Sequence, residues 1–379
     1  MNISGSLEFS GSLESSEVGS GVRVALPLFL TFICVIGFSG NLLLVAILIH
    51  DLRKGKCSEV NCLVVNVGAT DLLLLLFCIP VRIATYAQQS WLFGGFVCRT
   101  TEWFLHSCLA GKSFTLAAIA QARYRHVVTP PKLLGFRRRR LVLELLCAWA
   151  VSLLLPLPHL LFTRLRRGRQ GWTCGFHIPD YASNFMNVFS KVYPLLAYVL
   201  PMIFSFCCYL RALRRKEMRN RAPIPRALSR RVTSMLMSVS LAFDAMWLPE
   251  WIVWVWSRHS SYGLLQPPNA LMILAQVVLF LNCTINPAVF VAVSEEFREG
   301  LKNVWTTCRQ CGTTGPSRGE NGPSTVQTLH SMSSHRASQD SKMKEDKILP
   351  DVEHFWQDRR NTTAGEETDP MPWEHQEQP

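Results

Sequence analysis

The feature that most constrains this chain is a series of seven apolar blocks, each long enough to cross a lipid bilayer. A spanning helix needs roughly 20 mostly apolar residues. The blocks lie near residues 24–49, 60–87, 98–127, 141–163, 189–212, 231–257 and 268–293. Hydrophobic residues make up 49% of the 379 residues and charged residues only 17%, which is too apolar for an ordinary soluble domain. The sequence therefore predicts an all-α membrane protein, a bundle of seven transmembrane helices.

Basic residues gather in three of the loops between these spans, and all three loops fall on one side of the membrane. They lie at residues 53–56, 137–140 and 211–231. Loops rich in Lys and Arg normally stay in the cytosol. We therefore attribute the net charge of +12 to topology rather than to nucleic-acid binding. Residues 1–23 should be an extracellular tail, and because the number of spans is odd, the C-terminus should be cytoplasmic.

One loop on the outer side is also basic. It contains TRLRRGRQ, residues 163–170. Long loops cross the membrane largely regardless of their charge, so these basic residues need not affect the topology. It can equally attract an acidic ligand. The sequence leaves both explanations open.

Lys112 lies inside the third apolar block, where a lysine costs roughly 3 kcal/mol on insertion scales. Counted from Cys98, Lys112 is about 21 Å deep at 1.5 Å per residue. Counted from Val60, Asp71 is about 16 Å from the opposite surface. The two depths coincide in a core about 30 Å thick. We expect Asp71 to neutralise the ammonium, with Asp244 in the sixth span as the alternative partner.

Polar and aromatic residues recur at fixed points in the spans. The stretches are GNLLLVAIL (40–48), NVGATDLLLLLFCIP (66–80), ARY (122–124), FDAMWLPEW (243–251) and NCTINPAVF (282–290). In order and spacing they resemble the rhodopsin-like (class A) G-protein-coupled receptors, over residues 24–306. LLFCIP, WLPEW and EEFREG resemble the galanin-receptor branch. The tail stretches ILPDVEHFW and DPMPWEH are similar to those of the galanin-receptor-like orphan members of that branch.

The resemblance implies a ligand-operated receptor that signals to a heterotrimeric G protein and is not an enzyme. The implied ligand, which is a peptide in much of this branch, would enter an outer cavity faced by His106, Tyr193, Glu250, Trp254 and Gln276. The activation switch would comprise Phe243, Trp247, Pro249, Asn286, Pro287 and Phe290. The G protein would dock near Ala122, Arg123, Tyr124 and Tyr209. No cofactor or metal is expected.

Cysteine placement adds one extracellular prediction. Of the thirteen cysteines, the topology leaves only Cys98 and Cys174 near the outer surface. Because the extracellular side is oxidising, we expect these two to form a disulfide. The same pairing fits the family pattern.

Three positions depart from the family pattern. An acid usually precedes the arginine found here at 123, but this chain has Ala122, so the usual local partner of the guanidinium is missing. The family's Asn-Pro-x-x-Tyr ends here in Phe290, which has no hydroxyl. In the family, the positions matching Asp71, Lys112, Asn282 and Asn286 surround a sodium ion. The Lys112 ammonium should occupy the place of that cation.

The termini carry several further expectations. Asn2 begins a glycosylation sequon, and residues 294–305 should form a short amphipathic helix on the inner leaflet. Cys308 and Cys311 follow it and are candidates for palmitoylation. Residues 307–379 are too polar to bury a core and should be a disordered cytoplasmic tail. Two aromatic-acidic segments within that tail, 348–358 and 369–376, are either docking motifs for a cytoplasmic partner or isolated aromatics.

Alternative functions remain open from the sequence. A transporter or channel also carries charges in the membrane, but the chain shows no duplicated halves. A receptor-fold scaffold that acts mainly through its tail is the other alternative, and Ala122 and Phe290 keep it open. The galanin branch commonly has two histidines after its Trp-Leu-Pro. Glu250 and Trp251 stand there in this chain, which argues against galanin as the ligand.

Overall fold

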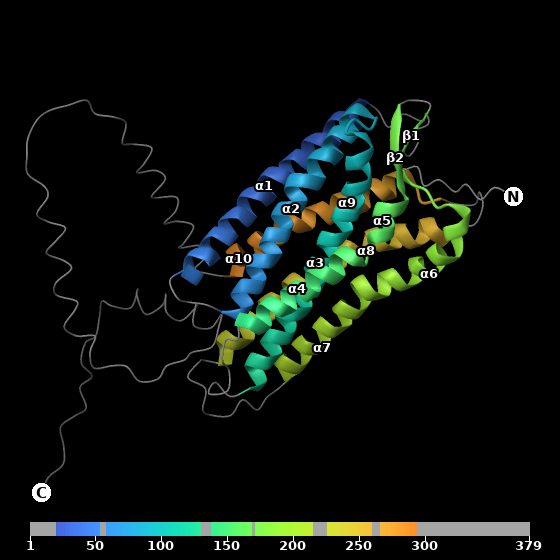
Figure 1. The fold of residues 1–379 in the computed structure, drawn as a ribbon. Coiled ribbons are helices and arrows are strands. Elements are labelled where there is room, and N and C mark those ends of the chain that lie inside the picture. The colour runs from blue at the N-terminus through green and yellow to red at the C-terminus, as the bar shows by residue number, and fades with distance from the viewer. Residues whose placement is uncertain are drawn as a thin grey trace, which may run out of the picture.

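The structure is a computed structural model that describes residues 20–53, 58–129, 138–168, 171–214, 226–259 and 266–293. Within these residues the chain makes seven helical passes, which lie side by side as a bundle (Figure 1). The first three are single helices, and the sixth is as well; the other three consist of two or three consecutive segments. In chain order the passes are α1 (Ser20–Arg53), α2 (Glu59–Gln88), α3 (Gly94–Val128), α4 (Arg138–Leu154) with α5 (Leu157–Phe162), α6 (Ser183–Pro194) with η3 (Leu195–Val199) and α7 (Leu200–Arg214), α8 (Arg226–His259), and α9 (Asn269–Leu281) with η4 (Asn282–Thr284) and α10 (Ile285–Val293).

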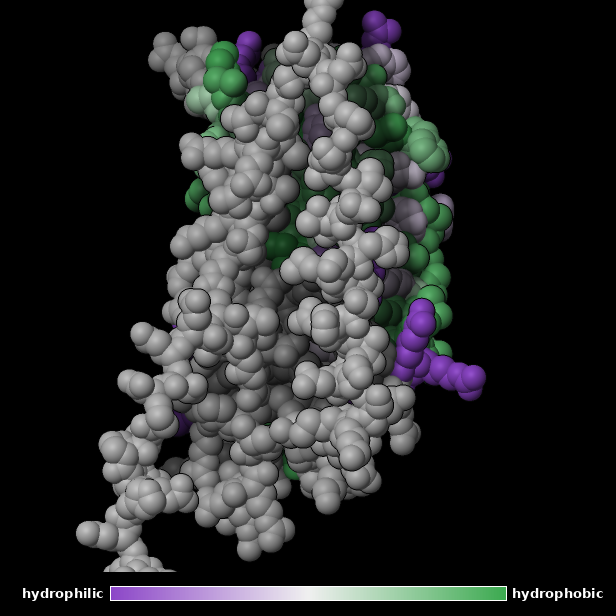
Figure 2. Space-filling view, turned by 90° about the vertical axis from the view of Figure 1, so that its left-hand side faces the viewer, coloured by the Kyte–Doolittle hydropathy of each residue, from purple (hydrophilic) through white to green (hydrophobic). Residues whose placement is uncertain are grey.

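Six of the passes, all except α3, are long and apolar enough to cross a membrane. Large apolar side chains lie exposed along α1, α4, α6 and α7, where a soluble protein would carry polar ones. In Figure 2, hydrophobic residues lie along the right-hand side of the bundle, and hydrophilic residues stand out near its top and at the lower right. This surface suits lipid around the flank and water at the ends, as the sequence predicts.

The helix α3 is the most polar pass because it is the most enclosed. It packs against α2, α4, α5, α7 and α8. Its buried residues include polar and charged side chains such as His106, Lys112 and Arg123. A helix that faces protein on all sides does not need an apolar surface, since its polar groups find partners in the bundle.

Three passes change their helical geometry at particular points. The fourth breaks between α4 and α5 beside Pro156. The fifth contains a π-helical stretch, η3, directly after Pro194. The seventh contains a 3₁₀ turn, η4, that begins at Asn282. Such irregular turns within membrane helices often accompany functional sites, because they redirect side chains into the bundle.

A β-hairpin covers one end of the bundle beside α5 (Figure 1). Strands β1 (Thr163–Arg167) and β2 (Trp172–Phe176) pair antiparallel, with Leu165 opposite Cys174. We call this end the disulfide end, because Cys174 is bonded there to Cys98 of α3. The opposite end is called the Arg123 end. The predicted disulfide is confirmed, whereas the two strands were not predicted, and a short 3₁₀ turn, η2 (Asp180–Ala182), follows them.

Several sequence predictions lie outside the described residues. They concern Asn2, the amphipathic helix at 294–305, Cys308, Cys311, and the tail segments 348–358 and 369–376. The limits proposed for the terminal tails also fall there, at least in part. Phe290 lies in α10, but its side chain is not among those described.

Candidate functional site

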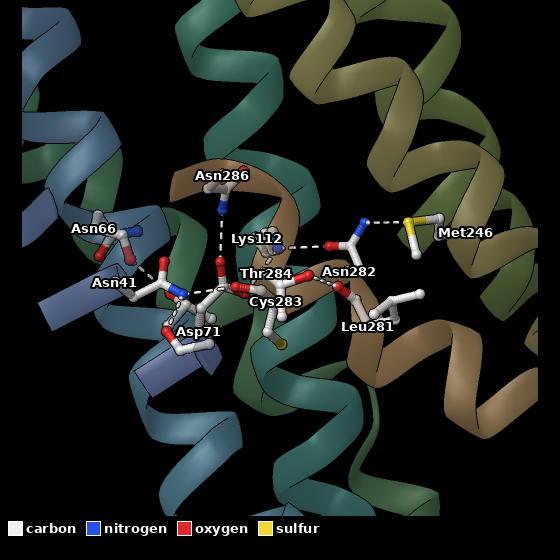
Figure 3. Close-up of polar contacts among 12 residues, drawn as sticks. Asn41, Asn66, Asp71, Lys112, Met246, Leu281, Asn282, Cys283, Thr284 and Asn286 are labelled. Carbon is white, nitrogen blue, oxygen red and sulfur yellow. Dashed lines mark hydrogen bonds and ion pairs between the residues drawn. The ribbon is translucent and has the colours of Figure 1, made fainter. Parts of the chain in front are cut away.

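The centre of the bundle contains a charged cluster built around Lys112. The Lys112 Nζ atom donates to Asp71 Oδ1 and to Asn282 Oδ1, each at 2.7 Å. Asn286 Nδ2 donates to the other carboxylate oxygen of Asp71 at 2.5 Å. Figure 3 shows these side chains converging from α2, α3, η4 and α10. We call these four residues the ion-pair centre.

Burial makes the pairing in this centre important. The Lys112 side chain is 1% exposed and that of Asp71 is 0% exposed. Two charges removed from water lose their hydration, and their mutual attraction and hydrogen bonds must offset that loss. Each of the four residues of the centre has such a bond. Within the described chain, Lys112 forms its ion pair with Asp71. Asp244, the alternative partner, accepts a hydrogen bond from the Tyr198 hydroxyl at its backbone carbonyl.

The ion-pair centre also touches α8. The Lys112 ammonium lies 5.3 Å from the centre of the Phe243 ring, within range of a cation–π attraction. Phe243 in turn packs against Trp247, with ring centres 5.2 Å apart. The Asn282 amide contacts Met246 at 3.7 Å. Sequence reasoning placed Phe243 in the switch but did not foresee its contact with Lys112, since depth counting does not fix how a helix is rotated.

Amide side chains from α1 and α2 extend the polar core around this centre. Asn41 donates to the backbone carbonyl of Cys283 at 2.6 Å, which ties α1 to η4 (Figure 3). Asn66 donates to Thr115 at 2.9 Å and accepts from the Trp149 indole at 3.1 Å. These bonds join α1 through α4 and the seventh pass around the buried charges.

The Arg123 end holds a second polar contact between helices. Arg123 is 1% exposed, and its Nε donates to the Thr233 hydroxyl of α8 at 2.8 Å. Its neighbour Ala122 is fully buried and offers no polar group. The Tyr209 hydroxyl lies 3.3 Å from that of Ser240, also on α8. Thr233 and Ser240 were not predicted as partners, because single hydroxyl residues in a span carry no distinctive pattern.

Aromatic side chains fill the bundle near the disulfide end. His106 stacks on His159 of α5 at 4.0 Å between ring centres, and Phe189 stacks on Tyr193 at 5.0 Å. Tyr193 also meets Trp251 at 5.1 Å. We call the following set the aromatic cluster: His106, His159, Phe189, Tyr193, Trp251 and Trp254. The ring centres of Trp251 and Trp247 lie 5.1 Å apart, so the cluster contacts a residue of the predicted switch.

Polar atoms in the aromatic cluster lack hydrogen bonds. Within the described part of the chain, five buried atoms of the cluster have no partner: His106 Nδ1, His159 Nε2, Tyr193 Oη, Trp251 Nε1 and Trp254 Nε1. Each such atom costs roughly 1–3 kcal/mol relative to a bonded one. Several such atoms in one place are unusual, because the core of a folded protein normally satisfies its buried polar groups.

A more polar set of residues lies toward α2 and α9 at the same end. Arg82 and Glu102 form an ion pair between α2 and α3. The Tyr86 hydroxyl donates to Gln276 at 2.7 Å. Glu250 is partly buried on α8. Of the five predicted pocket residues, the structure thus brings His106, Tyr193 and Trp254 into one cluster and holds Gln276 beside Tyr86 instead.

Comparison with known proteins agrees with this architecture. Residues 40–290 match the family described as 7 transmembrane receptor (rhodopsin family), and the chain belongs to that family. Members of this family are receptors that couple an extracellular ligand to a heterotrimeric G protein, so the protein is a multi-pass plasma-membrane receptor and not an enzyme.

Particular relatives place the chain within the family. It is 35% identical to human G-protein coupled receptor 151, with 100% of this chain and 95% of the relative covered. It is 29% identical to human galanin receptor type 2, covering 80% of this chain and 79% of the relative. Rat galanin receptor type 1 is 27% identical, over 74% and 81%. The predicted galanin-receptor branch is confirmed.

Proposed function

We propose that this receptor signals through an unusual switch, in which the Lys112 ammonium holds the position of a free cation. In this proposal the disulfide end faces the extracellular side and the Arg123 end faces the cytosol. An extracellular ligand acts on the aromatic cluster, and a G protein binds near Arg123, Tyr124 and Tyr209. The supporting observation is the contact of Lys112 with Asp71, Asn282 and the Phe243 ring.

A fixed lysine changes the electrostatics of the bundle centre. A free sodium ion binds and leaves, so its concentration shifts the balance between receptor states. The Lys112 ammonium is covalently part of α3 and already balances the Asp71 charge at 2.7 Å. A sodium ion that approached Asp71 would find its charge already neutralised and would be repelled by the Lys112 ammonium. The proposed receptor is therefore insensitive to sodium at this position.

The same lysine gives the centre a direct link to activation. Phe243 and Trp247 lie on α8, the helix that carries Pro249 and is expected to move on activation. Movement of α8 would separate the Phe243 ring from the ammonium. A cation–π contact contributes about 0.5–2 kcal/mol, which is enough to bias a two-state equilibrium several-fold. Lys112 thus favours the arrangement in which these groups touch.

The Arg123 end supplies a weaker restraint on the same movement. In place of an ion pair with an acid at position 122, Arg123 donates to the neutral Thr233 hydroxyl. Hydrogen bonds to a carboxylate are roughly twice as strong as neutral ones. We therefore propose a loosely held resting state and measurable basal signalling. Phe290, which replaces the usual tyrosine, acts in the opposite direction by weakening the active state.

The ligand would act on the aromatic cluster and its surroundings. Indole, phenol and imidazole groups there have unused hydrogen-bonding capacity. A ligand with carbonyl or carboxamide groups, such as a peptide, would satisfy them. The relatives include galanin receptors by name, but Glu250 and Trp251 replace the two histidines of that branch. We propose a peptide ligand other than galanin.

The test is nucleotide exchange on purified heterotrimeric G proteins, with the receptor in lipid nanodiscs. We expect exchange above that of empty nanodiscs, and loss of the increase in Arg123→Ala. A matched control is Arg138→Ala, an exposed arginine at the same end. If no G protein responds and Arg123→Ala has no effect, the scaffold alternative replaces this proposal. Ion flux through the same protein, reconstituted separately into liposomes, would instead indicate a channel.

A further inference from the structure

Asp244 is an acid at mid-depth in the sixth pass. The membrane-spanning part of α8 runs from Arg230 to Arg258, and Asp244 lies at its midpoint. At 1.5 Å per residue it is about 21 Å from either end. Its neighbour Phe243 lies against the Lys112 ammonium at the centre of the bundle, which agrees with this depth. An ionisable side chain in the middle of a span is costly and normally has a partner or a function.

The described part of the chain supplies no partner for the Asp244 carboxylate. The Tyr198 hydroxyl donates to the backbone carbonyl of Asp244 at 2.7 Å, not to its side chain. The described residues form no ion pair and no hydrogen bond with the carboxylate itself. The nearby Lys112 ammonium is bound to Asp71. A cation that pairs with Asp244 therefore comes from outside these residues.

The position of Asp244 on α8 places it at the edge of the outer surface of the bundle. Residues three and four apart share a face of a helix. On one side of Asp244 lie Ser240 and Trp247, which are buried, and on the other lie Leu241 and Leu248, which are 43% and 44% exposed. Asp244 itself is 9% exposed. Its carboxylate is therefore within reach of a long side chain that approaches from the lipid.

The fifth pass forms the other wall of this edge. It packs against α8 through α7. The Asp244 carboxylate lies within electrostatic range of both Tyr198 and Tyr209, so it faces the fifth pass between them. At the same height Met202 is partly buried and Phe206 is 44% exposed. We call the following set the α7–α8 seam: Met202, Phe206, Leu241, Asp244 and Leu248.

Two properties of the α7–α8 seam select the kind of partner. Backbone groups at mid-depth in lipid must be hydrogen-bonded within their own segment, so a partner that reaches Asp244 there is a helix. The apolar side chains of the seam offer packing surface, and the carboxylate requires a basic side chain. A second copy of this chain does not fit, because its described basic side chain at this depth, Lys112, is 1% exposed and bound to Asp71.

We propose that the α7–α8 seam docks a transmembrane helix of another membrane protein, one that carries a Lys or Arg near the centre of its span. The basic side chain is long enough to reach across the edge of the seam and pairs with Asp244. Pairing offsets the cost of burying both charges. The bound helix packs on α7 and α8 together. This inference goes beyond the receptor function proposed above and does not rest on it, because binding is measured without a G protein.

The experiment measures association of labelled model helices with the receptor in lipid vesicles. The probe is a helix of about 22 Leu and Ala residues with one central Lys, and its counterpart has Leu at that position and identical flanks. Energy transfer from a donor on the receptor to an acceptor on the helix is recorded as the helix-to-lipid ratio rises. We expect the Lys helix to associate at a ratio at least about tenfold lower than the Leu helix. Asp244→Asn should abolish this preference, and Asp244→Glu should keep it.

Matched variants separate the seam from general effects. Glu144→Gln removes an acid of α4 whose carboxylate already pairs with Arg140, and should leave the preference unchanged. Leu248→Trp adds bulk at the seam and should weaken association of the Lys helix. Leu76→Trp makes the same kind of change at an exposed residue of α2 and should have no effect.

The stability of Asp244→Asn gives an independent check. Because the carboxylate has no bond to lose among the described residues, this variant should melt no lower than the parent when no helix is added. Equal association of the Lys and Leu helices with the parent, or the same preference in Asp244→Asn, overturns the proposal. A variant that melts well below the parent also overturns it, because the carboxylate would then be paired within the receptor.

Discussion

The ion-pair centre and the aromatic cluster both bury polar atoms, but these atoms are hydrogen-bonded in the centre and lack partners in the cluster. In the centre, Lys112, Asp71, Asn282 and Asn286 all make hydrogen bonds to one another. In the aromatic cluster, Tyr193 and its neighbours bury polar atoms without partners in the described protein. Both regions touch Phe243 or Trp247 on α8.

The difference indicates different roles. A fully paired centre is expensive to open, because each separated charge would be left buried. It therefore suits a permanent element that defines one state of the bundle. A cluster with unused donors gains from any ligand that supplies acceptors. It suits a region that changes its contacts when a ligand arrives. Trp247 lies between the two and can carry the change from one to the other.

The largest expected effect is on the centre. Lys112→Met should lower the free energy of unfolding by about 3–5 kcal/mol, because Asp71 is left buried without its cation. Thermal melting of detergent-solubilised receptor measures it. His106→Phe is the matched change in the aromatic cluster and should cost less, since His106 Nδ1 has no bond to lose. Equal losses from the two changes would erase the distinction between the regions.

The sequence predicted all four residues of the centre but only part of the cluster, and the reason is physical. A buried lysine must find an anion, and only Asp71 and Asp244 lay at a suitable depth. Counting residues along helices of known rise was then sufficient. No comparable rule locates His159, whose position depends on the break between α4 and α5 at Pro156. Aromatic residues occur on many helix faces, so their convergence follows from tertiary packing alone.

The fold, too, was predictable from the sequence only in part. Apolar length located all seven helical passes, with ends within about six residues of those predicted. The hairpin was missed because its strands are only five residues long, and β1, with three arginines, does not show the apolar alternation of a buried strand. The partner of Arg123 was missed because Thr233 is one of many hydroxyl residues in the spans. Strong charges in membranes are predictable from sequence, whereas neutral contacts between helices are not.

The second prediction extends the comparison to the Arg123 end, where Arg123 donates to the Thr233 hydroxyl. Ala122→Asp would give Arg123 a charged neighbour and make this end resemble the paired centre. We expect basal signalling to fall, with a shift in the equilibrium of about 1–3 kcal/mol. Basal nucleotide exchange measures it, and Ala122→Asn is the uncharged control. Unchanged basal activity in a receptor that signals measurably would show that position 122 does not restrain it.

The third prediction concerns the unpaired hydroxyl of the cluster. Tyr193→Phe removes a buried Oη atom that has no partner in the described chain. Stability should stay the same or rise by about 1 kcal/mol, since a desolvated hydroxyl is lost and no bond is broken. Melting curves test this, with Tyr209→Phe as the control, since that hydroxyl lies 3.3 Å from Ser240. A clear loss of stability in Tyr193→Phe would mean that the cluster is bonded like the centre.

The smallest expected effect lies at the contact between the centre and α8. Phe243→Leu keeps an apolar side chain but removes the ring that lies 5.3 Å from Lys112. Basal nucleotide exchange should rise by a factor of a few, corresponding to about 0.5–1 kcal/mol. In a Lys112→Met background the same change should add nothing. An equal rise in both backgrounds would assign the effect to packing rather than to the cation.

The most direct test of the proposed switch is a double-mutant cycle on Lys112 and Asp71, melted in NaCl and in choline chloride. The parent should show no sodium-specific stabilisation. Lys112→Ser should be less stable by several kcal/mol and should regain part of that in NaCl, where sodium can approach the unpaired carboxylate. Lys112→Ser with Asp71→Asn should be more stable than additivity predicts and should not respond to sodium. Additive single changes, or a parent receptor stabilised by sodium over choline, would contradict the claim that Lys112 holds the cation's place.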